Sequence, residues 1–258
     1  MAIPAELIHE NPKSFVMAGD MGDVVYHLLF IKKLNAKKYH IDPWGGANYI
    51  RNGYIRCGDG NPGKFNLTKA LFLLPLLRAQ SYLDDVDLYT GDPADSWRYY
   101  DVNASEYHKD SLGLQNLTFF HAKKYKLDIK DLNEPWLEID KAWTVDSKRS
   151  IVINRTMRYR GNDNFYYFNR EQINERAVFV GVPEEHKDFV MRFGCTNLPF
   201  VPTPTALDLA RVIKGCKTFI GNGSLSAALA IGLGLEVEYE FCPPAAHYLF
   251  KRDNLRIF

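Results

Sequence analysis

Glycine and acid residues alternate in "GDMGD", between a short apolar run and a longer apolar stretch. Gly19-Asp20 and Gly22-Asp23 sit where a strand is expected to give way to a helix. Such residues can serve only to shape a turn, because glycine tolerates unusual backbone angles. They can also hold a carboxylate at the mouth of a cleft, since functional side chains gather on loops that a rigid scaffold positions. The sequence leaves both interpretations open at this point.

A basic cluster in "VINRTMRYRGND" follows a predicted strand. It contains three arginines within six residues: Arg155, Arg158 and Arg160. In an extended segment, side chains two residues apart point the same way. Arginine binds phosphate oxygens in a bidentate manner, and a diphosphate offers several such oxygens. The cluster therefore predicts phosphate binding, and a solvated basic strand end is the alternative.

A third stretch, "KTFIGNGSLSAALAIGLG", predicts a strand that ends at Gly221, a tight turn and a helix rich in small residues. The free backbone N–H groups at such a helix start form an anion site. Ser224 can cap the helix or bind a phosphate directly. Asn222, Gly223 and Ser224 are thus candidate diphosphate ligands, although an ordinary strand–helix turn with a serine cap gives the same pattern.

These stretches belong to a regular alternation of strands and helices. The first part predicts a strand at 14–17, helices at 24–34, 69–80 and 114–125, a strand at 86–89 and a long loop at 44–66. After a linker at 128–150, strands are expected at 150–154, 177–180, 217–220 and 236–240, with helices at 184–193, 206–214 and 224–233. Such alternation predicts an α/β fold with mostly parallel sheets and helices on both faces. We expect two Rossmann-like domains, residues 1–140 and 141–258, facing each other across a cleft.

Composition and net charge disfavour several classes of function. Lys plus Arg is 32 and Asp plus Glu is 31, so bulk charge does not suggest non-specific nucleic-acid binding. The four cysteines show no ligand spacing, which favours reduced thiols in a cytoplasmic protein and disfavours a zinc site. We predict neither a secretion signal nor an apolar run of the ~20 residues that a membrane span needs.

Two of these stretches resemble heptosyltransferase-like glycosyltransferases, which have the GT-B fold. "MGDVVYHLL" is similar to the family's amino-terminal Gly-Asp-Val signature through Gly22, Asp23 and Val24. The stretch from Gly221 resembles the family's nucleotide-sugar signature, with two departures: the family's acid is Gly223 here, and its histidine is Ala228. The resemblance covers residues 14–34 and most of 150–243.

The resemblance implies a metal-independent, inverting glycosyltransferase with no cofactor. Asp23 would be the catalytic base that removes the proton of the attacking hydroxyl, with Asp20 as a weaker candidate that orients the loop. Glu184 or Glu185 would bind the nucleotide ribose. The arginine cluster and the Gly221 turn would hold the diphosphate of a nucleotide-sugar donor, and Gly19, Gly22 and Gly221 would form the glycine loops. The hydroxyl acceptor stays unidentified.

Other classes fit less well. Asp85-Val86-Asp87 could be a metal-binding pair of a GT-A enzyme, but only a short apolar run precedes it. The first strand–helix unit has no Gly-x-Gly-x-x-Gly fingerprint, which disfavours an NAD enzyme, and no Gly-x-Ser-x-Gly elbow occurs, which disfavours a hydrolase. Two alternatives remain: a protein of the same fold that binds sugar nucleotides without catalysis, which Gly223 and Ala228 would suit, and a transferase acting on a macromolecule such as modified nucleic acid.

Overall fold

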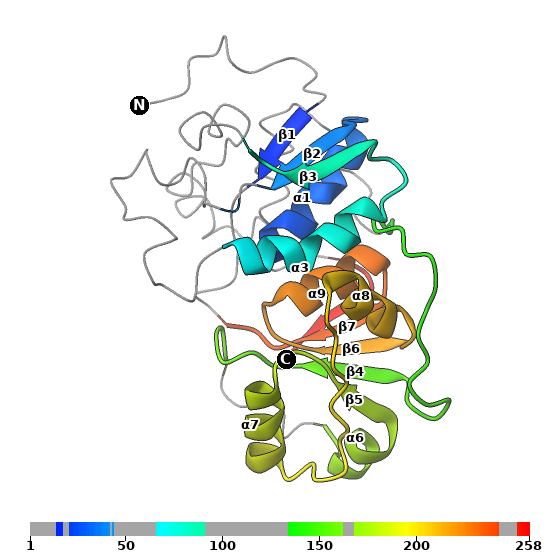
Figure 1. The fold of residues 1–258 in the computed structure, drawn as a ribbon. Helices are drawn as coiled ribbons and strands as arrows, with labels where there is room; N and C mark the ends of the chain where they lie inside the picture. The colour runs from blue at the N-terminus through cyan, green and yellow to red at the C-terminus, as the bar shows by residue number, and fades with distance from the viewer. Residues whose placement is uncertain are drawn as a thin grey trace.

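The strands in the described part of the chain form two parallel sheets (Figure 1). The structure is a computed structural model, and it describes residues 14–17, 21–41, 43, 66–90, 134–161, 168–242 and 252–258. The helix expected at 114–125 and the loop expected at 44–66, apart from Asn66, lie outside these residues. The α/β class with parallel strands is confirmed.

The first sheet has the order β1-β2-β3, with β1 at Ser14–Met17, β2 at Lys38–Ile41 and β3 at Asp85–Leu88. All its pairings are parallel, so each connection crosses over through a helix. Helix α1 spans Met21–Lys33 and α3 spans Leu67–Arg78. Eight successive residues of α1 are buried, which is the pattern of a helix covered on all sides.

The second sheet has the order β5-β4-β6-β7-β8 and is also parallel throughout. Its strands are β4 (Ile151–Asn154), β5 (Ala177–Phe179), β6 (Thr218–Gly221), β7 (Glu236–Tyr239) and β8 (Leu255–Ile257). The interior strand β4 is buried at all four positions, which is typical of parallel strands covered on both faces.

Four helices belong to this second sheet. They are α6 (Arg170–Arg176), α7 (Pro183–Phe193), α8 (Ala206–Lys214) and α9 (Leu225–Leu233). The expected bounds of α8 are confirmed, and Thr205 caps it by accepting a hydrogen bond from the Asp208 backbone N–H. Helix α6 and strand β8 were not expected from the sequence. None of the helices in the described ranges is long and apolar enough to cross a membrane.

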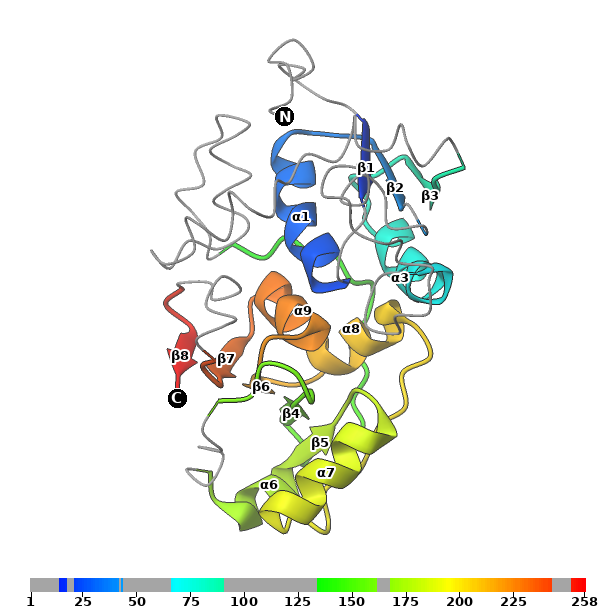
Figure 2. The same cartoon turned by 90° about the vertical axis from the view of Figure 1, so that its left-hand side faces the viewer.

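Helices from the two halves pack directly on each other. Helix α1 lies against α9, and α3 lies against α8, between the two sheets (Figures 1 and 2). One hydrophobic core therefore runs from Phe15 in β1 to Phe219 in β6. A second cluster, which includes Phe179 and Phe189, fills the opposite face of the second sheet.

The segment at 134–150 differs from the linker that the sequence predicts. It forms no helix or strand, but Trp136, Leu137 and Ile139 are buried in the shared core. Trp136 Nε1 donates to the Val25 carbonyl of α1 at 3.1 Å, and its backbone N–H donates to Gly232 of α9 at 2.9 Å. A Cβ atom at Gly232 would lie 2.8 Å from Leu137 Cδ1, so only glycine admits the segment this closely. The segment therefore packs against helices of both halves and is more than a linker between them.

Candidate functional site

A cavity of about 660 Å³ opens where the first turns of α1, α3, α7, α8 and α9 meet the end of β4. The loop after β4 and the turns after β5 and β6 complete its walls. The carboxyl ends of β4, β5 and β6 lie at one edge of a parallel sheet, which is where ligands of such folds bind. Segments far apart in the sequence thus converge on one cavity.

Asp23 lines this cavity from the first turn of α1. The helix begins at Met21, so Asp23 lies inside the helix and is not its N-cap. A carboxylate in a first turn is favoured by the helix dipole. A Cβ atom at Gly22 would lie 3.7 Å from the Ser224 carbonyl oxygen, which shows that the starts of α1 and α9 are in contact. Gly19 and Asp20 lie outside the described residues.

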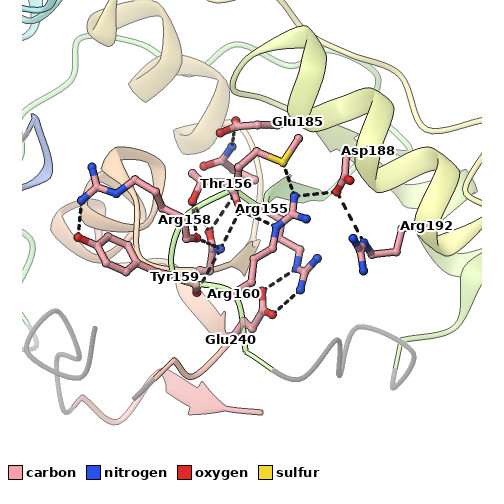
Figure 3. A network of polar contacts seen from close by, with 12 residues as sticks. Arg155, Thr156, Arg158, Tyr159, Arg160, Glu185, Asp188, Arg192 and Glu240 are labelled. Carbon is pink, nitrogen blue, oxygen red and sulfur yellow. Dashed lines mark hydrogen bonds and ion pairs between the residues drawn. The ribbon is translucent and has the colours of Figure 1, made fainter. Parts of the chain in front are cut away.

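The first arginine of the basic cluster does not face the cavity. The Arg155 guanidinium binds the Glu240 carboxylate at two points, with Nη2–Oε1 at 2.7 Å and Nε–Oε2 at 2.8 Å (Figure 3). Both side chains are 1% exposed. The structure does not place the Arg155 guanidinium where it could contact a diphosphate in the cavity, because a partner 85 residues away holds its side chain in the interior.

Arg160 is also held by an acid. Its Nη2 donates to Asp188 Oδ2 of α7 at 2.7 Å, and its Nε donates to the Thr156 carbonyl at 3.0 Å. Arg160 does not line the cavity, but Arg158 does. The exposed Arg158 stacks on the Tyr159 ring at 4.6 Å from its centroid and donates to the Tyr159 hydroxyl (Figure 3). Of the three arginines, Arg158 is the one placed to meet a ligand.

Asn222 shapes the arginine loop instead of reaching into the cavity. Its Nδ2 donates to three backbone carbonyls of that loop, among them Arg158 O at 2.8 Å, and its Oδ1 accepts from the Thr156 backbone N–H at 2.9 Å. Its side chain is fully buried. Tyr159 adopts a left-handed backbone with φ of 55°, which is uncommon for a non-glycine residue. The Asn222 hydrogen bonds stabilise this costly loop conformation.

The turn between β6 and α9 contributes Gly223 and Ser224 to the cavity wall. Ser224 Oγ accepts from the Ala227 backbone N–H at 3.1 Å, so Ser224 is the helix N-cap. Gly221 ends β6 just outside the cavity lining, and a Cβ atom there would lie 2.0 Å from the Asn154 carbonyl oxygen. Glycine at this position lets β6 pass close to the end of β4.

The structure separates the two candidate ribose ligands. Glu185 lines the cavity, whereas Glu184 is exposed and does not. Glu185 Oε2 accepts from Asn154 Nδ2 and from the Val182 backbone N–H, both at 3.3 Å. Burial raises the pKa of the Glu185 carboxyl, and these hydrogen bonds oppose the shift. Glu185 can therefore accept hydrogen bonds from a ligand as a partly desolvated carboxylate.

Several cavity residues were not singled out from the sequence. Tyr26 lines the wall one helical turn after Asp23, and Thr68, Lys69 and Phe72 line it from α3. Asn154, the last residue of β4, lies beneath Glu185. The position of Asn154 at a strand end is a usable signal, but nothing in the sequence of α3 indicates that its first turn lines the same cavity as α9 and the loop after β4.

Comparison with known proteins gives a match in structure only. Neither the protein-family models nor the curated protein sequences match this chain. The crystal structure of a glycosyl transferase family 9 protein from Veillonella parvula DSM 2008 matches with a TM-score of 0.50 and 15% identity, over 95% of this chain and 85% of that one. Heptosyltransferase WaaC from E. coli, solved with ADP-2-deoxy-2-fluoro heptose, gives a TM-score of 0.46 and 13% identity, over 95% and 92%. The same enzyme with ADP gives 0.47 and 12% over the same shares.

The match with the V. parvula protein shows that this chain has the fold of family 9 glycosyltransferases. The expected resemblance is thereby confirmed for the fold. At this level of identity the activity does not follow from the fold, because one fold hosts many functions. The function has to be argued from the cavity.

Proposed function

We propose that this chain is an inverting glycosyltransferase that moves a sugar from a nucleoside-diphosphate sugar to a hydroxyl acceptor. The observation that carries the proposal is the shared cavity of Asp23 and Arg158, which come from opposite halves of the chain and meet beside the start of α9. A carboxylate opposite a guanidinium and a helix N-terminus is what a proton acceptor facing a departing diphosphate requires.

The donor would occupy the side formed by the second sheet. Arg158 and the backbone N–H groups at the start of α9 would bind the diphosphate, and Glu185 would accept hydrogen bonds from the ribose hydroxyls. Arg155, Arg160 and Asn222 would position the loop that carries Arg158. In this proposal residues 141–258 form the nucleotide-sugar-binding domain, and residues 1–140 form the acceptor-side domain.

The chemistry would run as a single displacement. The acceptor oxygen attacks the anomeric carbon while Asp23 takes its proton, and the bond from that carbon to the diphosphate breaks with its electron pair on the leaving oxygen. Arg158 and the start of α9 would stabilise the charge that develops on the diphosphate. We propose that Arg158 and the start of α9 stabilise this charge without a metal ion or another cofactor.

Asp23→Asn tests the proposal directly. Donor binding should persist, seen as a nucleotide-dependent rise in melting temperature, while turnover should fall by about 100-fold or more. Asp87→Asn is the matched control, because Asp87 lies on β3 and pairs with Arg78 away from the cavity. Unchanged turnover in Asp23→Asn would remove Asp23 from the mechanism.

A binding protein without catalysis is the second candidate, and the two departures from the glycosyltransferase signature favour it. Ala228, which replaces the histidine, is fully buried in α9 and presents no polar group. If this candidate holds, nucleotides will raise the melting temperature but no pair of donor and acceptor will give product. A nucleic-acid acceptor would reveal itself by binding that weakens steeply with salt.

A further inference from the structure

Tyr239 places a buried hydroxyl beside the turn that starts α9. Tyr239 ends β7 and lies in register with Gly221 on β6, and its side chain is 1% exposed. The hydroxyl finds no hydrogen-bond partner within the described part of the chain. A buried hydroxyl without a partner costs free energy, so such groups in proteins usually serve a ligand, a water or a functional role.

The hydroxyl lies behind Gly223, where the cavity wall has no side chain. A Cβ atom at Gly223 would lie 2.9 Å from Tyr239 Oη and 3.5 Å from Tyr159 Cδ2. Tyr239 also interacts electrostatically with Tyr159 and with Tyr26. Gly223, Tyr159 and Tyr26 all line the cavity. Three neighbours of the hydroxyl are thus cavity residues, and Gly223 places no side chain between the hydroxyl and the cavity.

The chemistry of this position suits an anion. Burial raises the pKa of the Tyr239 phenol, so the group stays protonated and can donate a hydrogen bond. The neighbouring start of α9 carries the positive end of the helix dipole and free backbone N–H groups. Hydrogen bonds from a neutral donor to an ionised oxygen are stronger than those between neutral groups.

We propose that Tyr239 is a donor-site residue whose hydroxyl binds a phosphate oxygen of the nucleoside diphosphate through the gap at Gly223. The proposal rests on the glycosyltransferase function argued above. It assigns a ligand contact to a residue that lies behind the cavity wall. In this chain a tyrosine from the next strand supplies the polar group that a side chain at position 223 would otherwise provide.

Tyr239→Phe is the test, because it removes only the hydroxyl. We expect the affinity for ADP, GDP or UDP, measured by calorimetry, to fall about 10-fold, as for the loss of one hydrogen bond to a charged group. The melting temperature of the ligand-free protein should not fall, because the hydroxyl has no hydrogen-bond partner among the described residues. Tyr82→Phe is the matched control: its hydroxyl lies near Gln80 and Trp136, away from the cavity, and its loss should leave affinity unchanged.

Gly223→Ala adds an independent check on the geometry. Its Cβ atom should collide with the hydroxyl and lower the melting temperature, and adding Tyr239→Phe should restore much of that loss. If wild-type protein binds a nucleoside diphosphate and Tyr239→Phe binds it equally well, the role of Tyr239 is overturned while the glycosyltransferase proposal stands. If wild-type protein binds no nucleoside diphosphate, both proposals fall.

Discussion

Arg155 and Glu240 form a two-point ion pair in the interior, between the loop after β4 and the segment after β7. The Gly161 backbone N–H donates to the same carboxylate at 2.9 Å. The pair thus ties both ends of the arginine loop to the far side of β6. The ion pair fixes the shape of the loop, and this loop places Arg158 in the cavity wall.

Removing one member of this pair should destabilise the protein strongly. Glu240→Ala leaves a buried guanidinium without its carboxylate, and we expect a loss of about 3 to 5 kcal/mol in the free energy of unfolding. Replacing both members, as in Arg155→Met with Glu240→Leu, should cost much less, since no charge is left buried. Urea denaturation measures both. A loss below about 1 kcal/mol for Glu240→Ala would mean that the ion pair does not hold the loop.

Asn222→Asp should damage the loop although the two side chains have the same shape. Aspartate cannot donate to the carbonyls of Thr156, Arg158 and Tyr159, and its charge would face their oxygens. We expect a loss of about 2 kcal/mol or more in the free energy of unfolding, and weaker nucleotide binding. Calorimetry and denaturation report the two effects. Full stability in this variant would contradict a role for Asn222 in the loop.

Arg158→Gln and Arg160→Gln form a matched pair. Arg158 lines the cavity, so its loss should weaken nucleoside-diphosphate binding about 10-fold with little effect on stability. Arg160 contacts Asp188 and the Thr156 carbonyl, so its loss should act mainly on stability. Binding isotherms and melting curves of both variants separate the roles. Equal loss of affinity would place both arginines on the ligand.

Glu185 should make nucleotide binding depend on pH. The ribose hydroxyls would donate to its ionised carboxylate, and burial raises its pKa, so affinity should fall on acidification and should begin to fall at a higher pH than an ordinary glutamate would give. Glu185→Gln should bind more weakly and lose this part of the dependence. Glu184→Gln, an exposed acid in the same turn of α7, should keep the wild-type profile.

The same raised pKa has a consequence for folding. Because the folded pKa lies above the unfolded one, the carboxyl favours the folded state most below its unfolded value, and this contribution is lost as the pH rises through the folded pKa. Glu185→Gln should not show this decline. Parallel stability profiles for wild type and Glu185→Gln in the ligand-free state would contradict the burial of this group.

Local sequence signals predict much of the fold. Helix α8 has an amphipathic pattern and a Thr205 cap, and its bounds are found where they are expected. Strand β4 begins with the apolar run Ile151–Ile153 and is found one residue shorter than expected. Helix α6 was missed because "REQINER" contains one apolar residue, Ile173, and so shows no helical periodicity. Strand β8 is three residues at a sheet edge, too short for a pattern to register.

The candidate site is predictable to a lesser extent, because a spacing does not reveal a distant partner. Asp23, Arg158, Glu185, Gly223 and Ser224 do line one cavity. Arg155 forms an ion pair with Glu240, and Arg160 forms one with Asp188. Neither pairing can be inferred from the positions of these acids in the sequence. Tyr239 is likewise hidden in the sequence, where it reads only as an apolar position of a strand. The roles of these residues stay predictions.

The buried strip around Trp136 bears on how a ligand enters. Trp136 hydrogen-bonds to α1 and α9 at once, and the hydrophobic core it joins is continuous between the two sheets. Swinging the halves apart would expose that core to water, which the hydrophobic effect opposes. Substrate entry should therefore depend on rearrangement of residues at the rim of the cavity. The residues beneath should stay fixed and hold donor and acceptor in their relative positions.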